Sequence, residues 1–231
     1  LAVNKDLDYL KCKLSNGDTY YLAAENLNAP RLEKEFKSDK DWIKGVPKLK
    51  PISQIFNERG GYTIEQTLKG SDLIGLEYNG PFDELEASSI HGGHPFTNPD
   101  LQSKEINAIK CHQIIDGGKD SLGNEFVVAG EGSGIVHVAP GCGDADYKIG
   151  IRKNLVSIAP LDEETNFTKE FDWLNGKNAT DSETVKLIID NLNSKGLLLH
   201  SELYPHVYPH CWRSGDELVF RLVYEWYINM D

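Results

Sequence analysis

Apolar and polar residues alternate near the start of the chain, in the pattern of half-buried strands. One alternating run covers residues 8–14 and a second covers residues 19–22, and Asn16-Gly17 lies between them. Asn-Gly between two alternating runs is typical of a tight hairpin turn, because both residues tolerate the backbone conformation that such a turn requires. The sequence therefore predicts a β-hairpin over residues 8–22.

Helical spacing appears twice in the second half of the chain. After Asp181, apolar residues recur at i, i+3, i+4 and i+7, and Gly196 follows where a helix commonly ends; they are Val185, Ile188, Ile189 and Leu192. Asp144 is expected to cap a second helix in which apolar residues are four apart, namely Tyr147, Ile151 and Leu155. Residues 25–37 predict a short helix that is interrupted near Pro30.

Several further runs are apolar or β-branched and predict short strands, namely residues 71–78, 108–115, 126–129, 134–139, 197–200 and 217–223. Glycines and prolines within residues 86–104 predict a long loop, and residues 38–60 show no clear pattern. Many short strands, few helices and no regular βαβ alternation favour an α+β fold centred on a β-barrel with peripheral helices.

Composition and charge limit the classes of function. The 231 residues include 24 basic and 36 acidic side chains, a formal charge of −12, which excludes an extended basic surface for nucleic acid. No apolar run reaches the roughly 18 residues of a membrane span, so no membrane partner is expected. The four cysteines are too sparse for a disulfide framework, which favours free thiols in the cytoplasm. Because the chain begins at Leu1, we expect it to be a piece of a longer one.

Three familiar kinds of site are not supported by their sequence context. The glycines of residues 130–134 lead into a strand-like run, whereas a dinucleotide-binding loop opens a helix. On a strand, Ser133 and His137 would lie about 13 Å apart, too far for a nucleophilic triad with Asp146. A dyad of Cys142 with His137 is no better supported. A zinc site at His206, His210 and Cys211 lacks a fourth ligand, so no metal site is predicted.

The informative stretch is residues 134–147. A strand is expected to deliver His137 to one face, and a Pro-Gly-x-Gly turn follows, where glycines allow a close backbone approach to a ligand. Asp144 and Asp146 then open a helix, whose dipole and N–H groups keep a carboxylate ionised. Asp146 is therefore suited to an ammonium ligand. The alternative is structural, with Asp144 as the helix cap and Asp146 as a charge that complements the helix dipole.

Three spaced segments resemble the editing domain of isoleucyl-tRNA synthetases, a hydrolytic insertion in the catalytic domain. Residues 132–143 with Asp146-Tyr147 resemble the family motif G-T-G-I-V-H-x-A-P-G-x-G…D. The other segments are residues 71–78 with 81–83, and 208–213 with 218–221. The resemblance implies that residues 1–231 are a single editing domain excised from a larger synthetase, with residues 204–231 returning toward the catalytic body.

The resemblance also implies the roles of site residues. His137 is expected to line the pocket for the rejected side chain, and Asp146 to hold the substrate's α-amino group; these two are the predicted catalytic residues. The other predicted substrate-binding residues are Gly134, Ile135, Val136, Ala139, Pro140, Gly141, Cys142 and Gly143. Valyl and leucyl relatives typically carry lysine or methionine in place of His137, which favours the isoleucyl family.

The implied reaction is hydrolysis of valyl-tRNA(Ile), and hydrolysis of valyl adenylate stays open. The expected partners are the 3′ end of tRNA(Ile) carrying valine and the rest of the synthetase. No cofactor is expected in this domain, whereas the parent enzyme would use ATP and Mg. Two alternatives stay open: an editing domain of the valyl or leucyl relatives, and a non-catalytic module that holds the tRNA end. The chain departs from the family at Ser133, where threonine is usual, and lacks the threonine-rich strand expected upstream of Leu1.

Overall fold

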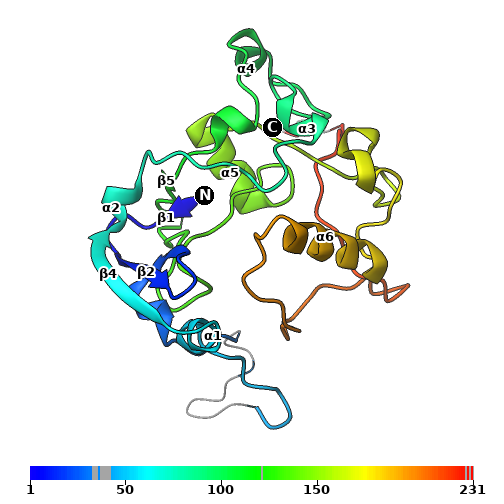
Figure 1. Ribbon diagram of the computed structural model, residues 1–231. Coiled ribbons are helices and arrows are strands. Elements are labelled where there is room, and N and C mark those ends of the chain that lie inside the picture. The colour runs from blue at the N-terminus through cyan, green and yellow to red at the C-terminus, as the bar shows by residue number, and fades with distance from the viewer. Residues whose placement is uncertain (33–35, 37–42, 121, 227, 229, 231) are drawn as a thin grey trace. The chain divides into compact units, whose positions relative to one another are not determined.

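The computed structural model describes residues 1–32, 36, 43–120, 122–226, 228 and 230 (Figure 1). The chain divides into two compact units. Unit 1 and unit 2 are each assembled from three stretches of sequence. Unit 1 contains Leu1–Tyr78, His112–His137 and Leu198–Pro209, and unit 2 contains Asn79–Cys111, Val138–Leu197 and His210–Asp231.

The predicted α+β class is confirmed, because helices and strands both occur. The described residues form a three-stranded antiparallel sheet and a two-stranded parallel sheet, both within unit 1. They form no closed barrel, in contrast to the prediction. A barrel requires every strand to have two neighbours, whereas the outer strands of the three-stranded sheet each pair with the central strand alone.

The three-stranded sheet is built on the predicted hairpin. β2 (Asp8–Leu14) lies in the centre, with β3 (Thr19–Ala23) on one side and β4 (Tyr62–Lys69) on the other. β2 and β3 pair antiparallel, and Gly17 in the turn has a φ of +97°, so the hairpin is confirmed. β4 was not predicted, because it is exposed along most of its length and its sequence lacks a buried apolar face.

The two-stranded sheet consists of β1 (Ala2–Val3) and β5 (Ile115–Asp116), which pair in parallel. Val136 forms an antiparallel bridge with Ala2, through backbone hydrogen bonds of 2.8 and 2.9 Å. Val136 is the one residue of the predicted strand 134–139 for which the structure shows strand pairing, and the stretch belongs to no named strand. The backbone around Val136 is nevertheless anchored to the start of the chain.

Unit 1 is stabilised by two apolar clusters, and the buried ring of Tyr9 belongs to the second. The Tyr9 hydroxyl donates a hydrogen bond of 2.7 Å to the Gly134 carbonyl oxygen and accepts one of 3.1 Å from the Asn4 N–H. The buried members of the first cluster are Leu10, Cys12, Leu14, Leu22, Leu27 and Phe56, and those of the second are Val3, Tyr9, Ala23 and Leu73. The phenol therefore links groups 125 residues apart in sequence, inside the core.

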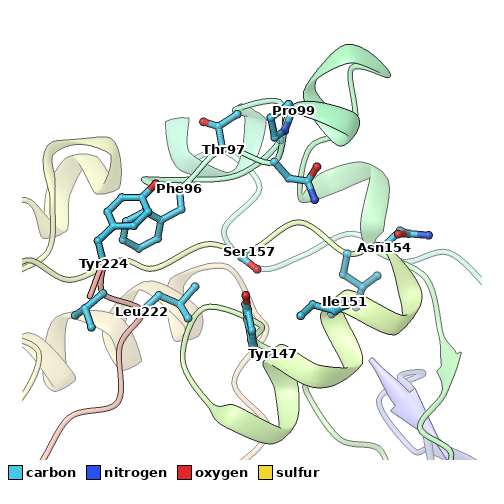
Figure 2. A pocket seen from close by; sticks show the side chains of 14 residues that line it. Phe96, Thr97, Pro99, Tyr147, Ile151, Asn154, Ser157, Leu222 and Tyr224 are labelled. Atoms are coloured by element: carbon cyan, nitrogen blue, oxygen red, sulfur yellow. The ribbon is translucent and has the colours of Figure 1, made fainter. Parts of the chain in front are cut away.

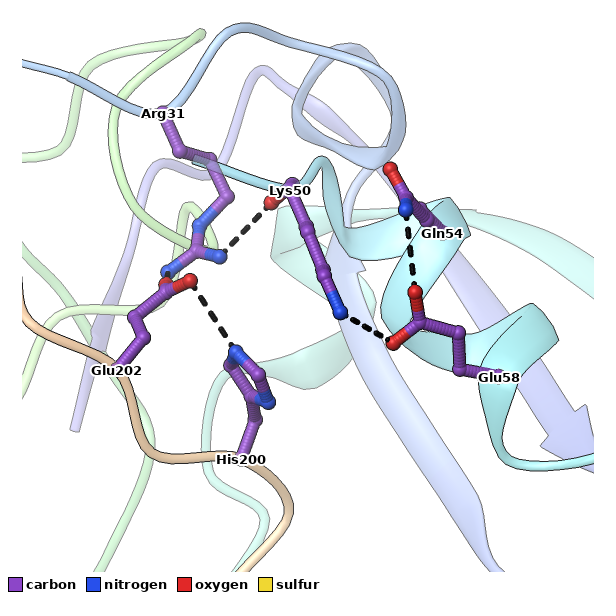
Figure 3. A network of polar contacts seen from close by, with 6 residues as sticks. All are labelled: Arg31, Lys50, Gln54, Glu58, His200 and Glu202. Atoms are coloured by element: carbon purple, nitrogen blue, oxygen red, sulfur yellow. Dashed lines mark hydrogen bonds and ion pairs between the residues drawn. The ribbon is translucent and has the colours of Figure 1, made fainter. Parts of the chain in front are cut away.

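A polar network holds the stretch after Leu197 against the rest of unit 1 (Figure 3). Arg31 pairs with Glu202, whose carboxylate lies 3.1 Å from the His200 Nε2 atom. Arg31 also donates to the Lys50 carbonyl oxygen at 2.9 Å, and Lys50 pairs at 2.7 Å with Glu58 at the end of α1 (Ile52–Glu58). Residues 197–200 form no strand, in contrast to the prediction, and the contact of His200 with Glu202 holds the end of this stretch.

Unit 2 is mainly helical in its described part. Its apolar cluster has four buried members, namely Leu85, Ala87, Phe171 and Leu174. The helices are α3 (Glu86–Ser89), α4 (Pro99–Ser103), η3 (Ile109–Cys111), α5 (Asp144–Lys153), η4 (Lys169–Leu174) and α6 (Ser182–Ser194). α3 and α4 lie inside the stretch that was predicted to be a loop.

The two predicted long helices are confirmed as α5 and α6. Gly196 follows α6 with a φ of +69°, as its position predicted, and Ile188 packs against the apolar cluster of unit 2. In α5 the side facing the core carries Ile149, which is 1% exposed. The predicted apolar stripe on α5 instead contains Tyr147 and Ile151, whose exposed fractions are 40% and 62%.

Most of the other predicted strands are wrong, because a short apolar run does not specify a pairing partner. Gly70–Leu73 forms α2, whose first turn is closed by a 2.9 Å bond from the Lys69 N–H to Asp72. The runs 108–115 and 217–223 contribute β5, η3 and the isolated bridges Glu77–Gln113 and His210–Glu217. Of the predicted helix 25–37, η1 (Ala24–Leu27) is present, and residues 33–35 and 37 lie outside the described residues.

The Tyr9 hydroxyl is expected to contribute measurably to the stability of unit 1. Tyr9→Phe leaves the Gly134 carbonyl and the Asn4 N–H without their partner in a buried site, which costs about 1–3 kcal/mol. We expect a corresponding decrease in the free energy of unfolding, measured by urea titration. The control is Tyr21→Phe, on a ring that is 39% exposed, where a change within about 0.5 kcal/mol is expected. Equal effects of the two substitutions would contradict this role of Tyr9.

Candidate functional site

The predicted site motif enters α5 through a tight turn in unit 2. The Cys142 N–H donates to the Ala139 carbonyl oxygen at 2.9 Å, which closes the turn. Gly143 is the N-cap residue of α5 and makes no side-chain capping bond. Asp144 was predicted to be the cap. It is instead the first residue of the helix. Its carboxylate is exposed and pairs with Lys148 at 2.7 Å, one turn along the helix.

The glycines of this turn are required by packing. A Cβ atom on Gly141 would overlap the carbonyl group of Ile158, and one on Gly150 would lie 2.7 Å from the Pro140 Cβ. Gly141, Gly150 and Pro140 are all buried. Packing against the protein's own backbone thus accounts for Gly141, whose predicted contact with substrate stays a prediction.

The Asp146 carboxylate reaches back from the first turn of α5 over the preceding turn. Its Oδ1 atom accepts a 3.2 Å hydrogen bond from the Ala139 N–H. Its Oδ2 atom lies 2.8 Å from the place where a Cβ on Gly143 would stand, so a side chain at Gly143 would displace the carboxylate. Asp146 is half-buried and adds an acidic group to the positive end of the helix dipole. The orientation of this carboxylate is therefore set by the backbone of the turn.

The upstream half of the motif belongs to unit 1. Gly134 is buried with a φ of +75°, and a Cβ there would overlap the side chain of Ala23. Ile135 packs against the second apolar cluster, and Val136 provides the bridge to the first strand. His137 is exposed. The predicted catalytic residues are thus distributed over both units, with His137 in unit 1 and Asp146 in unit 2.

Two residues of the motif could in principle act as nucleophiles, Ser133 and Cys142. The Ser133 hydroxyl is engaged in local hydrogen bonds, and the Cys142 thiol is protonated at neutral pH. The Ser133 hydroxyl donates to the Ile135 carbonyl at 3.1 Å and accepts from its N–H at 3.3 Å. Desolvation of the sulfur raises the pKa of the Cys142 thiol, and the Asp146 carboxylate raises it further. Since the thiolate is the reactive form, Cys142 is a poor nucleophile at neutral pH.

Two cavities of unit 2 open beside α5, and neither was predicted. The smaller has a volume of about 230 Å³, the larger about 530 Å³ (Figure 2). The smaller is lined by Gly141, Gly143, Asp144, Tyr147, Phe220, Arg221 and Leu222. Tyr147 lines both cavities. The one sequence signal that could have indicated Tyr147 as a cavity-lining residue was its position directly after Asp146 in the motif.

Two further searches concern the described part of the chain alone. Within it, no three His, Cys, Asp or Glu side chains gather closely enough to hold a metal ion. No helix of the described residues is both long and apolar enough to cross a membrane.

Comparison with known proteins identifies the family. No family model matches the chain. The isoleucine–tRNA ligase of Tetrahymena thermophila is 32% identical over 234 residues, which cover 100% of this chain and 17% of that enzyme. That of Aquifex aeolicus is 34% identical over 195 residues, with 84% and 18% covered. The enzyme of Rickettsia bellii (strain OSU 85-389) is 31% identical over 231 residues, with 100% and 16% covered.

This chain is homologous to a segment of isoleucine–tRNA ligases. The family predicted from the motifs is confirmed. The chain spans about a sixth of the length of the curated relatives it matches. An isoleucine–tRNA ligase therefore contains much more chain than the segment described, and the activity of the whole enzyme does not follow from this segment alone.

The pKa of Cys142 gives a direct test of the contacts around the turn. We expect its alkylation by iodoacetamide to require a higher pH than alkylation of Cys211, whose pKa is lowered by hydrogen bonds from Ser214 and the neighbouring backbone. Mass spectrometry over a pH series measures both thiols in one sample. Asp146→Asn should lower the pKa of Cys142 but leave it above its ordinary value, because desolvation is the larger cause. Identical pH profiles for the two thiols would contradict the desolvated position of the Cys142 sulfur beside Asp146.

Proposed function

We propose that this segment is the editing domain of an isoleucine–tRNA ligase and hydrolyses valyl-tRNA(Ile). The supporting observation is the match to isoleucine–tRNA ligases over the full chain, together with the motif of residues 132–146. In this proposal residues 1–231 act as one editing domain, and residues 204–231 lead back to the catalytic body.

Such a domain is needed because a single binding pocket cannot discriminate well between amino acids that differ by one methylene. A pocket for isoleucine cannot exclude valine well, since one methylene is worth only about 1–3 kcal/mol. A second site that admits valine but is too small for isoleucine removes the error after the wrong ester has formed. The second site needs an anchor for the amino group, a size limit for the side chain, and a positioned water.

Asp146 is the proposed anchor for the α-ammonium group of valine. The Ala139 N–H bond fixes the direction of this carboxylate, and the first turn of α5 places it at the positive end of the helix dipole. An ion pair with the ammonium would then hold the adjoining ester at a defined place. The carboxylate is half-buried, so solvent competes less with the substrate than at an open surface.

His137 is proposed to set the size limit, and the backbone and small side chains of Gly134–Gly143 to surround the ester. Hydrolysis adds water across the ester: the water oxygen joins the carbonyl carbon, and the bond to the ribose oxygen breaks. Valine and the free ribose hydroxyl at the 3′ end of the tRNA are released, and the ribose oxygen takes up a proton from the water. The step relies on orientation of water beside the ribose hydroxyls, which requires no covalent enzyme intermediate.

The tRNA is proposed to be recruited largely by the rest of the enzyme. A net charge of −12 repels phosphate over about 8–10 Å at physiological salt. The domain would therefore receive the single-stranded 3′ end of a tRNA that is bound elsewhere. ATP and Mg would serve aminoacylation in the catalytic body of this cytoplasmic enzyme and take no part in the hydrolysis.

A second candidate function is a non-catalytic module that holds the tRNA end. The observation that favours it is the hydrogen bond between Asp146 and Ala139, because this contact gives the carboxylate a structural role. Asp146→Asn separates the two candidates, since asparagine retains an oxygen that accepts from the Ala139 N–H but loses the negative charge.

Loss of the Asp146 charge should abolish most of the editing. In a full-length isoleucine–tRNA ligase carrying this segment, Asp146→Asn and Asp146→Ala remove an ionic hydrogen bond of about 1.5–3 kcal/mol. We expect hydrolysis of valyl-tRNA to slow about 10- to 100-fold while isoleucine activation is unchanged, measured by deacylation of labelled valyl-tRNA. The matched control is Asp144→Ala, on the exposed carboxylate two residues earlier, which should leave hydrolysis unchanged. Normal hydrolysis by Asp146→Asn would favour the non-catalytic module.

Removal of the His137 imidazole should enlarge the pocket. His137→Ala is expected to let the enzyme hydrolyse correct isoleucyl-tRNA, because the volume that excludes the extra methylene is gone. Deacylation of isoleucyl-tRNA and valyl-tRNA is measured side by side. His91→Ala, on another exposed histidine, should leave isoleucyl-tRNA intact. Loss of hydrolysis toward both substrates would instead assign His137 to general-base catalysis.

A further inference from the structure

The glycine-rich loop of residues 130–134 in unit 1 leads into the segment that ends at His137. Gly130 and Gly132 have φ values of +83° and +56°, and Glu131 between them is exposed. A Cβ atom on either glycine would have no described atom within 4 Å, so the backbone conformation requires these glycines and close packing does not. The first three residues of the loop therefore depend on other groups for a fixed shape, because glycine loses the most backbone entropy when it is ordered.

One buried side chain holds these three residues. Asn26 lies in η1 and has an exposed fraction of 0%. Its Oδ1 atom accepts a 2.8 Å hydrogen bond from the Gly130 N–H. Its Nδ2 group donates to the carbonyl oxygen of Glu131 at 2.6 Å and to that of Gly132 at 3.1 Å. With the amide turned over, a donor would face the N–H and an acceptor would face both carbonyls, so the three contacts fix its orientation.

The polar side chain at this buried position is explained by the loop and not by the core. A buried carboxamide costs free energy unless its donors and its acceptor are bonded. The next residue of η1, Leu27, is also buried and packs in the first apolar cluster. An apolar residue of similar size would therefore serve the core at Asn26, whereas only a group with both donors and an acceptor can bind the loop as Asn26 does.

Further contacts continue this attachment as far as the residue before His137. The Ala23 N–H donates to the Ser133 carbonyl oxygen at 2.8 Å. The Gly134 carbonyl is held by a buried hydroxyl and Val136 by its bridge to the first strand, as described above. The core of unit 1 thus fixes the path of the backbone toward His137, and the contacts of Asn26 are the first in this series.

We propose that Asn26 is a positioning residue of the editing reaction. By holding residues 130–132, it sets the path of the segment that presents His137 to the substrate, without contacting the substrate itself. This role rests on the proposed function, in which His137 sets the size limit. A displacement of about 1 Å in a reacting arrangement can cost roughly 100-fold in rate. Because the tRNA is proposed to be recruited by the rest of the enzyme, loss of the contacts should lower kcat and leave KM unchanged.

The first experiment removes the three hydrogen bonds at nearly constant side-chain volume. In a full-length isoleucine–tRNA ligase carrying this segment, Asn26→Leu should lower kcat for hydrolysis of valyl-tRNA about 10- to 100-fold, with KM within about twofold. Hydrogen exchange of residues 130–137, followed by mass spectrometry, should become faster, because the Gly130 N–H loses its acceptor. The matched control is Leu27→Ala, which opens a cavity beside the same helix but keeps the contacts of Asn26. It should leave both kcat and this exchange unchanged.

The second experiment gives a pH profile that distinguishes positioning from a loss of stability. In Asn26→Asp, an ionised carboxylate has no donor for the two carbonyl oxygens, whereas the protonated form can donate to one of them. Burial favours the protonated form. Hydrolysis relative to the unchanged enzyme at the same pH should therefore be lowest at high pH and recover in part as the pH falls, at a temperature at which circular dichroism shows every variant to be folded. Asn28→Asp, on the exposed residue that follows η1, should give a ratio independent of pH.

The role of Asn26 is overturned if Asn26→Leu hydrolyses valyl-tRNA at the unchanged rate, or if Leu27→Ala slows hydrolysis as much. A ratio for Asn26→Asp that does not vary with pH would also overturn it. Failure of the proposed function has a different result: the unchanged enzyme and every variant then leave valyl-tRNA intact, while exchange of the loop still responds to Asn26→Leu.

Discussion

The close approach of two backbone segments at Gly141 is the constraint on which the candidate site depends. No side chain fits there, because the Ile158 carbonyl group occupies the space of a Cβ atom. The contact fixes the turn that precedes α5, and Gly150 on Pro140 secures the same turn from the helix side. Glycine at these positions is thus a condition for placing the first turn of α5, and with it the Asp146 carboxylate.

A similar constraint operates in unit 1 at Gly134. Its positive φ and its contact with Ala23 exclude a side chain, and its carbonyl is held by the Tyr9 hydroxyl. Gly134 and Gly141 lie seven residues apart, and each is fixed by the core of its own unit. A motif that resembles a ligand-binding loop is therefore, at its two ends, a packing motif.

The net charge of this segment bears on its proposed role within a longer enzyme. The chain is acidic overall, yet the end of α5 is basic and the adjoining cavity is uncharged. An acidic surface is poorly suited to bind a whole nucleic acid by itself, which is why the proposed function leaves recruitment of the tRNA to the rest of the enzyme. That agrees with a chain which covers about a sixth of the length of its isoleucine–tRNA ligase relatives.

The sequence by itself determined the features that depend on local interactions. Asn16-Gly17 specified the hairpin, helical spacing specified α5 and α6, and the motif around His137 specified the family. Tertiary structure decided the rest. Strand pairing needs a partner, so short apolar runs became bridges, turns or exposed stretches in place of a barrel. The hydrogen bond of Asp146 to Ala139 and the cavity beside Tyr147 arise only when distant segments pack, and no spacing along the chain encodes them.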